Sequence, residues 1–274
     1  MAKIIRKIFN IFLIINCVYA FADIKIGSNT YANIQAALNG AIAGETVLLG
    51  PATYTGAGNV ALSWPNVNGI TLKADPAQLA TSQNVILDAQ FITRHILVNQ
   101  QISFNIESIS FINGLVSTQN VSDDASEYGG SIYAGTSNVT INIKNCIFAK
   151  NNARYGGAIA LGAKNIENCL FVSNNALTGG ALFSGDNLIT ASIFINNYAE
   201  SDGGVIANGF STMNNCVLQS NSANFMGGAF SYGFNALINC QISGNRAAVY
   251  GGGFGLGDVN NLLLINCQVN NNNG

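Results

Sequence analysis

A glycine pair returns six times along the second half of the chain at a nearly constant interval. Successive pairs begin 27, 23, 24, 24 and 24 residues apart, and each is followed by a mostly small residue and then a bulky apolar one. A fixed period of this length is typical of a solenoid, in which each repeat forms one coil that contacts only its neighbours. The pairs are Gly129-Gly130, Gly156-Gly157, Gly179-Gly180, Gly203-Gly204, Gly227-Gly228 and Gly251-Gly252.

A second marker keeps the same period: an Asn five residues after a Cys or Ser. Because both markers stay in register, we predict an all-β fold, a right-handed parallel β-helix with about 24 residues per coil. A solenoid offers mostly surface for binding, so a compact catalytic pocket is less expected. The pairs are Cys146/Asn151, Cys169/Asn174, Ser192/Asn197, Cys216/Asn221, Cys240/Asn245 and Cys267/Asn272.

Three further columns of the repeat predict what each position does. The large apolar residue two places after each glycine pair is predicted to point inward. The glycines allow backbone angles that other residues resist, so they are predicted to mark a sharp entry into the strand. A second apolar column, two residues after the Cys or Ser, is also predicted to be core. Stacked Asn amides about 4.8 Å apart can hydrogen-bond along the stack, so the Asn column is predicted to be a structural ladder. The two apolar columns are Ile132, Ile159, Leu182, Ile206, Phe230, Phe254 and Phe148, Phe171, Phe194, Leu218, Ile242, Val269.

A leucine-rich repeat has a similar period and must be considered. Its strand pattern is partly matched by the segment from Leu237 to Asn245. In that class, however, the chain returns through a helical segment. Here the other half of each repeat holds Gly-Gly and a strand-like apolar run, which disfavours helix. The β-helix is therefore the preferred fold.

The chain divides into three segments. Residues 1–22 read as a signal peptide, 23–125 as an N-terminal cap with the first coils, and 126–274 as regular repeats that end without a cap. Residues 34–38 are predicted to form a helix that covers the first coil, and 46–49 a strand; further strands are expected at 70–72, 85–87, 96–98 and 108–112. Two or three strands per coil suit this spacing. An uncapped parallel edge recruits other strands, so we expect end-to-end self-association of the chain as given.

The first 22 residues have the features of an export signal. Lys3, Arg6 and Lys7 form a basic start, residues 8–19 are mainly apolar, and 20–22 read Ala-Phe-Ala, a small-x-small cleavage site. The apolar run is too short for a comfortable membrane span. We therefore expect cleavage before Asp23 and an exported protein at the outer membrane surface or outside the cell. The mature chain keeps eight of 11 basic residues against 13 acidic ones, without a basic cluster, so nucleic acid is not an expected partner.

One cysteine, Cys17, lies in the expected signal peptide, and the other five all stand in one repeat column. An odd, evenly spaced set does not suit a disulfide framework, and with no CxxC and a single His a zinc site is not expected. We predict that these cysteines are small buried apolar residues with free thiols. His95 is predicted to be a turn or surface residue rather than a catalytic base. No cofactor or metal is expected.

The repeat motifs resemble those of the polymorphic outer membrane proteins, the chlamydial autotransporters known for GGA[I/L/V] and FxxN repeats. GGAI stands at 156–159, GGAL at 179–182 and GGVI at 203–206, while FxxN stands at 148–151, 171–174 and 194–197. The entry region is similar to the start of pectin-lyase-like β-helix proteins. The resemblance implies a surface-exposed β-helix passenger that adheres to host cells or other surfaces, with an unknown ligand. The chain as given departs from that family because no membrane barrel follows the repeats.

Three functions compete. The first is a secreted or surface-exposed adhesin-like module without catalytic residues. The second is a polysaccharide lyase or hydrolase, which would need clustered carboxylates for Ca²⁺ and a basic proton acceptor. Its candidates are Asp123, Asp124 and Glu127 with Lys150 or Arg154, for which a solvated acidic loop is the alternative reading. The third is a truncated or partial product of a longer gene.

Overall fold

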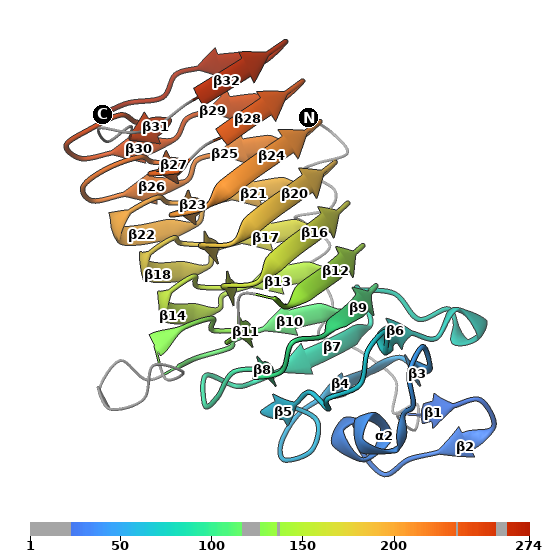
Figure 1. Ribbon diagram of the computed structural model, residues 1–274. Helices are drawn as coiled ribbons and strands as arrows, with labels where there is room; N and C mark the ends of the chain where they lie inside the picture. Colours follow the sequence, from blue (N-terminus) through green and yellow to red (C-terminus); the bar gives the residue numbers. More distant parts are fainter. Residues whose placement is uncertain (1–22, 117–126, 136–137, 234, 256–261) are drawn as a thin grey trace.

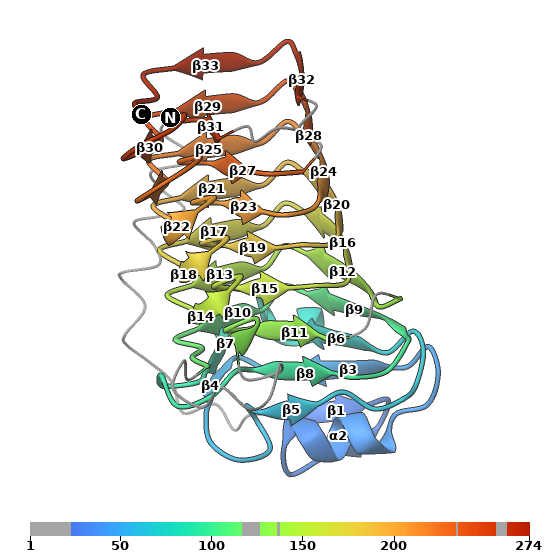
Figure 2. The same cartoon turned by 60° about the vertical axis from the view of Figure 1, so that its left-hand side comes forward.

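The computed structural model describes residues 23–116, 127–135, 138–233, 235–255 and 262–274. Over these residues the chain winds into a parallel β-helix whose coils stack from the N-terminal end to the C-terminal end (Figures 1 and 2). The predicted fold class is therefore confirmed. The predicted signal peptide and two of the candidate residues for glycan cleavage, Asp123 and Asp124, lie outside the described residues.

Four sheets run along the stack. The eleven-stranded sheet contains, in order, β2 (Asn29–Thr30), β1 (Ile24–Ile26), β3 (Thr46–Leu49), β6 (Thr71–Ala74), β9 (Ser103–Glu107), β12 (Thr140–Lys144), β16 (Ala163–Glu167), β20 (Asp186–Thr190), β24 (Phe210–Asn214), β28 (Asn235–Ile238) and β32 (Leu262–Ile265). The nine-stranded sheet contains β4 (Ala52–Tyr54), β7 (Val85–Asp88), β10 (Ser110–Ile112), β13 (Ile147–Ala149), β17 (Leu170–Val172), β21 (Ile193–Ile195), β25 (Val217–Gln219), β29 (Gln241–Ser243) and β33 (Gln268–Asn270).

The other two sheets close each coil. The eight-stranded sheet contains β5 (Leu62–Ser63), β8 (Ile96–Val98), β11 (Ile132–Ala134), β15 (Ile159–Ala160), β19 (Leu182–Phe183), β23 (Ile206–Ala207), β27 (Phe230–Ser231) and β31 (Phe254–Gly255). The five-stranded sheet contains β14 (Asn152–Tyr155), β18 (Asn175–Thr178), β22 (Tyr198–Asp202), β26 (Ser222–Ala223) and β30 (Arg246–Ala247). The first coils thus have three strands each, as expected, and the later coils gain a fourth. Since the glycine-pair half of each repeat enters a strand, the leucine-rich-repeat alternative is wrong.

The N-terminal end of the solenoid is closed by a helix and an antiparallel hairpin. Helix α2 (Ile34–Gly40) begins at the N-cap Asn33, whose side chain accepts from the Ala36 amide at 2.8 Å. Its Ile34 and Leu38 are fully buried at the base of the core. Strand β1 pairs antiparallel with β3 and β2, so the first parallel strand is not left open. The predicted helix and its role as a cover are confirmed.

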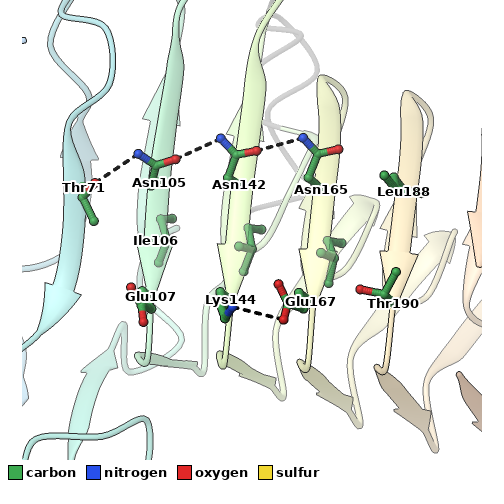
Figure 3. A pocket seen from close by; sticks show the side chains of 12 residues that line it. Thr71, Asn105, Ile106, Glu107, Asn142, Lys144, Asn165, Glu167, Leu188 and Thr190 are labelled. Carbon is green, nitrogen blue, oxygen red and sulfur yellow. Dashed lines mark hydrogen bonds and ion pairs between the residues drawn. The ribbon is translucent and has the colours of Figure 1, made fainter. Parts of the chain in front are cut away.

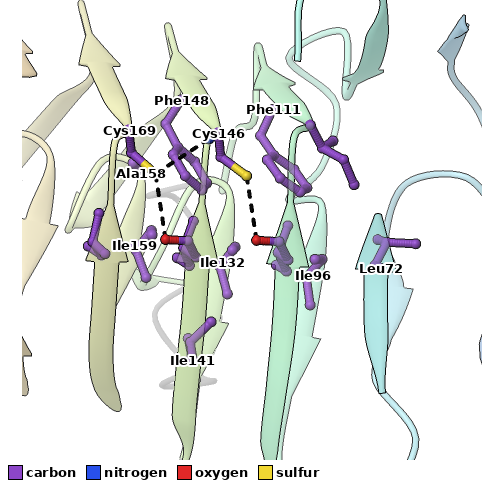
Figure 4. Packing of buried hydrophobic residues seen from close by; sticks show 14 of the residues in the cluster. Leu72, Ile96, Phe111, Ile132, Ile141, Cys146, Phe148, Ala158, Ile159 and Cys169 are labelled. Atoms are coloured by element: carbon purple, nitrogen blue, oxygen red, sulfur yellow. Dashed lines mark hydrogen bonds between the residues drawn. The ribbon is translucent and has the colours of Figure 1, made fainter. Parts of the chain in front are cut away.

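The core is built from the predicted inward columns, aligned coil on coil (Figure 4). Ile132 pairs with Ile159 in the register, and both side chains are fully buried. In the second column, four phenylalanine rings stack with centroids 5.1, 4.9 and 4.7 Å apart and planes within 9° of parallel. This spacing is close to the spacing between neighbouring strands, so the same residue type in successive coils stacks ring on ring. The rings belong to Phe111, Phe148, Phe171 and Phe194.

The two glycines of each pair are required for different structural reasons. The first glycine of every pair lies in the left-handed region, as Gly156 does at φ +65°, where side chains are disfavoured. At the second, space is the limit: a Cβ on Gly157 would lie 2.3 Å from the main-chain oxygen of Gly180 in the next coil. The predicted repeat glycines Gly156, Gly157, Gly179, Gly180, Gly203, Gly204, Gly227 and Gly228 are therefore framework residues.

The predicted Asn ladder is confirmed. From Asn174 onward, the side-chain oxygen of each rung accepts from both the main-chain and side-chain N–H groups of the Asn one coil earlier. At the first rung, the Asn151 oxygen accepts from the Gly114 amide at 2.8 Å. The side-chain NH₂ also donates to a main-chain oxygen in the preceding coil. Every rung is fully buried, so the ladder satisfies turn groups that water cannot reach. The rungs are Asn151, Asn174, Asn197, Asn221 and Asn245.

The cysteine column has the predicted character. Cys146, Cys169, Cys216 and Cys240 are buried free thiols, and Cys267 in the last coil is partly exposed. The thiol of Cys146 lies 3.3 Å from the main-chain oxygen of Lys144. Burial raises the pKa of Cys146, which keeps it a neutral thiol and makes it a weak nucleophile.

Candidate functional site: the outer face of the eleven-stranded sheet

An open hollow of about 420 Å³ lies on the outer face of the eleven-stranded sheet, over β6 to β20 (Figure 3). Side chains alternate across a strand, so on β9 Phe104 and Ile106 point into the core while Asn105 and Glu107 point outward. The parallel register repeats this alternation in β12 and β16. Two straight outward rows of polar side chains result.

The first row consists of amides. Asn105 donates to the Thr71 hydroxyl at 3.0 Å, Asn142 donates to Asn105 at 2.9 Å, and Asn165 donates to Asn142 at 2.8 Å. The next residue in the row is Leu188, which is 51% exposed and carries no donor. Unlike the inner ladder, these amides face solvent, so their remaining donor and acceptor positions are open to a ligand.

The second row, two residues further along each strand, consists of alternating charges. Lys73 pairs with Glu107 at 2.9 Å, and Lys144 pairs with Glu167 at 3.1 Å. Both partners of the second pair are about half exposed, so each pair contributes only about 0–1 kcal/mol to stability. The row has no net charge. It therefore offers both signs to a ligand without a field that would select a polyanion.

The residues nominated for glycan cleavage lie elsewhere. Glu127 and Arg154 form an ion pair at 2.7 Å, and Arg154 is on the outward side of β14 in the five-stranded sheet. This carboxylate raises the pKa of Arg154, which holds the guanidinium protonated. Lys150 lies exposed at a left-handed turn after β13. Within the described ranges, no three His, Cys, Asp or Glu side chains are grouped as a metal site would require.

His95 is in the core, so its predicted place at a turn or on the surface is wrong. The side chain is fully buried, and its Nε2 lies 3.0 Å from the Leu87 oxygen and 3.1 Å from the Ile112 oxygen. Because carbonyls only accept, Nε2 carries the proton. Burial lowers the pKa of His95 to about 4, so the ring is neutral at physiological pH. His95 precedes Ile96 as Ser131 precedes Ile132, so it stands in the column of mostly small residues; no glycine pair marks this position, because Thr93-Arg94 precedes His95.

A buried lysine was also missed by the sequence reasoning. Lys164 points from β16 into the solenoid and is fully buried, with its ammonium nitrogen 3.0 Å from the Gly162 oxygen and 2.7 Å from the Ser184 oxygen. Burial lowers the pKa of Lys164 to about 7. It begins a short polar row inside the core that continues through the buried residues Asn187, Ser211 and Asn235.

The outward amide row leaves only a weak signal in the repeat. Asn142 and Asn165 each stand four residues before a column cysteine, Cys146 and Cys169. Only these two regular coils have the Asn, which is too few for a repeat marker.

Comparison with protein-family models, curated proteins and solved structures gives no match to this chain. No helix in the described part of the chain is long and apolar enough to cross a membrane.

Proposed function

We propose that this protein is an exported, adhesin-like β-helix module that holds hydroxyl-rich surfaces against the outer face of its eleven-stranded sheet. The observation that carries the proposal is the pair of outward rows: an amide row beside a charge-neutral row on one flat, open face. Amide and carboxylate groups both bind hydroxyls, and amides at a regular spacing of about 4.8 Å suit a polymer with repeated polar units. The repeat motifs that resemble polymorphic outer membrane proteins support the same reading.

The charge balance narrows the ligand class. Lys73 and Lys144 are each paired with a glutamate, so the face has no unbalanced positive charge to attract an acidic polymer. A neutral polysaccharide fits better than a sulfated or uronic one. For the glycan-cleaving alternative, the ion pair of Arg154 with Glu127 argues against a free proton acceptor at that position.

The test is retention of beads coated with the purified chain on dextran and on heparin surfaces. We expect retention on dextran, a loss of that retention in Asn142→Leu, and little retention on heparin. Gln219→Leu is the matched control, because Gln219 is an exposed amide on β25 of a different sheet. Retention on heparin alone, or an equal loss in the control, would contradict the proposal.

A further inference from the structure

The outer face of the nine-stranded sheet is apolar over its central strands, whereas polar residues such as Asp88 and Gln241 stand on the outer face nearer its two ends. Phe148, Phe171 and Phe194 point inward on β13, β17 and β21, so their neighbours along each strand point outward. Two outward rows result, aligned by the parallel register. We call these residues the apolar strip: Ile147, Leu170, Ile193 and Val217 in one row and Ile112, Ala149, Val172 and Ile195 in the other.

The strip is shielded although it faces away from the main core. Leu170 is 3% exposed and Val172 8%, whereas Leu188, on the outer face of the eleven-stranded sheet, is 51% exposed. Leu170 and Val172 form an apolar cluster whose other members also lie on the nine-stranded sheet. Neighbours within one flat sheet surround a side chain but do not cover its tip. An aligned apolar strip on an outward face is therefore a candidate docking surface.

The size of the strip argues against a second solenoid as the occupant. Five strands at about 4.8 Å and three residues across give about 20 by 10 Å, or roughly 200 Å². A standard protein interface buries about 800 Å² on each partner. A strip of this size suits a single segment of chain.

The first described residue, Asp23, lies beside the edge of this sheet. The main-chain oxygen of Asp23 accepts from the Gly50 amide at 2.8 Å, and β4, the edge strand of the nine-stranded sheet, starts at Ala52. Residues 8–22 can extend over about 50 Å. From β4 to β21 there are five strand spacings, about 24 Å, so the apolar residues 8–19 reach the strip.

We propose that the apolar strip is the docking surface for the chain's own N-terminal segment, residues 8–19, as long as that segment remains attached. The segment is rich in Ile, Leu, Val and Phe, so it matches the strip in chemistry as well as in reach. Cleavage before Asp23 then uncovers the strip, so that processing of the chain exposes an apolar surface at this face.

Photo-crosslinking of the uncleaved 274-residue chain tests this directly. A benzophenone amino acid replaces Leu13, and the crosslinked peptides are mapped by mass spectrometry after irradiation. We expect crosslinks to β13, β17 and β21. In the same chain, Ile193→Asp should lower their yield about tenfold, the change that 1.4 kcal/mol of lost affinity produces. Leu188→Asp is the matched control, because it places the same charge on the same coil but on the eleven-stranded sheet.

Crosslinks to another face, no crosslinks, or an equal effect of the two aspartates would overturn the proposal. If circular dichroism shows that Ile193→Asp does not fold, the reciprocal pair gives the answer. The crosslinker is then placed at position 193 and the disrupting change is Leu13→Asp, which leaves the sequence of the solenoid otherwise untouched. Loss of the crosslinks to residues 8–19 supports docking, and their persistence refutes it.

Discussion

Removal of one rung of the inner Asn ladder should be among the most damaging changes of a polar side chain in this protein. Asn221→Ala deletes four hydrogen bonds of 2.9–3.0 Å. Two are donated by the Asn221 side chain to the Phe194 and Asn245 oxygens, and two are accepted from the N–H groups of Asn197. All of these groups are buried, and Ala can replace none of them.

The magnitude follows from the groups left behind. The main-chain N–H of Asn197 loses its acceptor, the Phe194 oxygen loses a donor, and the side-chain NH₂ of Asn197 keeps only its bond to the Phe171 oxygen. An unsatisfied buried polar group costs about 1–3 kcal/mol, so we expect a loss of about 3–5 kcal/mol in the free energy of unfolding. With a urea m-value of about 3 kcal/mol/M, the midpoint should fall by roughly 1–1.7 M.

The assay is urea unfolding followed by circular dichroism, with Asn165→Ala as the matched control. Asn165 makes a similar amide-to-amide bond of 2.8 Å, but in solvent, so its loss should change stability by less than about 0.5 kcal/mol. If Asn221→Ala shifts the midpoint no more than the control does, water enters the turn and replaces the amide. The argument that the ladder satisfies groups inaccessible to water would then be refuted.

Three further predictions follow from the buried groups. Because the folded-state pKa of Lys164 is about 7 and that of a free lysine 10.5, the unfolded chain binds more protons at this residue between these values; the stability of the chain relative to Lys164→Met should therefore rise from pH 7 to 10, whereas a constant difference would show that the ammonium stays charged in the core. Gly157→Ala should prevent stable folding because the added Cβ would lie 2.3 Å from a main-chain oxygen, whereas Gly253→Ala, whose nearest contact would be 3.5 Å, should be tolerated. Equal urea midpoints for the two variants would show that the coils can move apart. Alkylation under denaturing, non-reducing conditions should label both Cys216 and Cys240, and recovery of a disulfide between them would contradict the free-thiol assignment.

The regular coils could be predicted from the sequence because each position repeats its environment. The columns of Ile159, Phe171 and Asn174 were assigned correctly. A residue that stacks on the equivalent residue of the next coil has the same kind of neighbour in every coil, so its environment can be inferred from the repeat. His95 and Lys164 were not, because each occurs once and the period gives no second observation. A lone lysine is expected on the surface, and only the two carbonyl oxygens around its ammonium explain how Lys164 is accommodated.

The outer face was equally hard to predict, for a different reason. The rows of Asn142 and Lys144 change character after β16, where Leu188 and Thr190 follow. An outward position is free to vary because it does not have to match the coil above. The apolar strip could not be predicted from the sequence either, because Ile147 and Leu170 are apolar neighbours of the inward phenylalanines and resemble core residues.

The two amide rows described above run in opposite directions along the solenoid. In the inner ladder, each Asn donates its amide toward the next coil, as Asn174 does to Asn197. In the outer row, each donates toward the preceding coil, as Asn165 does to Asn142. The aligned side-chain dipoles of the outer row therefore end in an exposed oxygen at Asn165, and the face has a direction as well as a pattern. A polymer whose repeat units have a direction would therefore meet the donors and acceptors of this face in a different order in each of its two orientations.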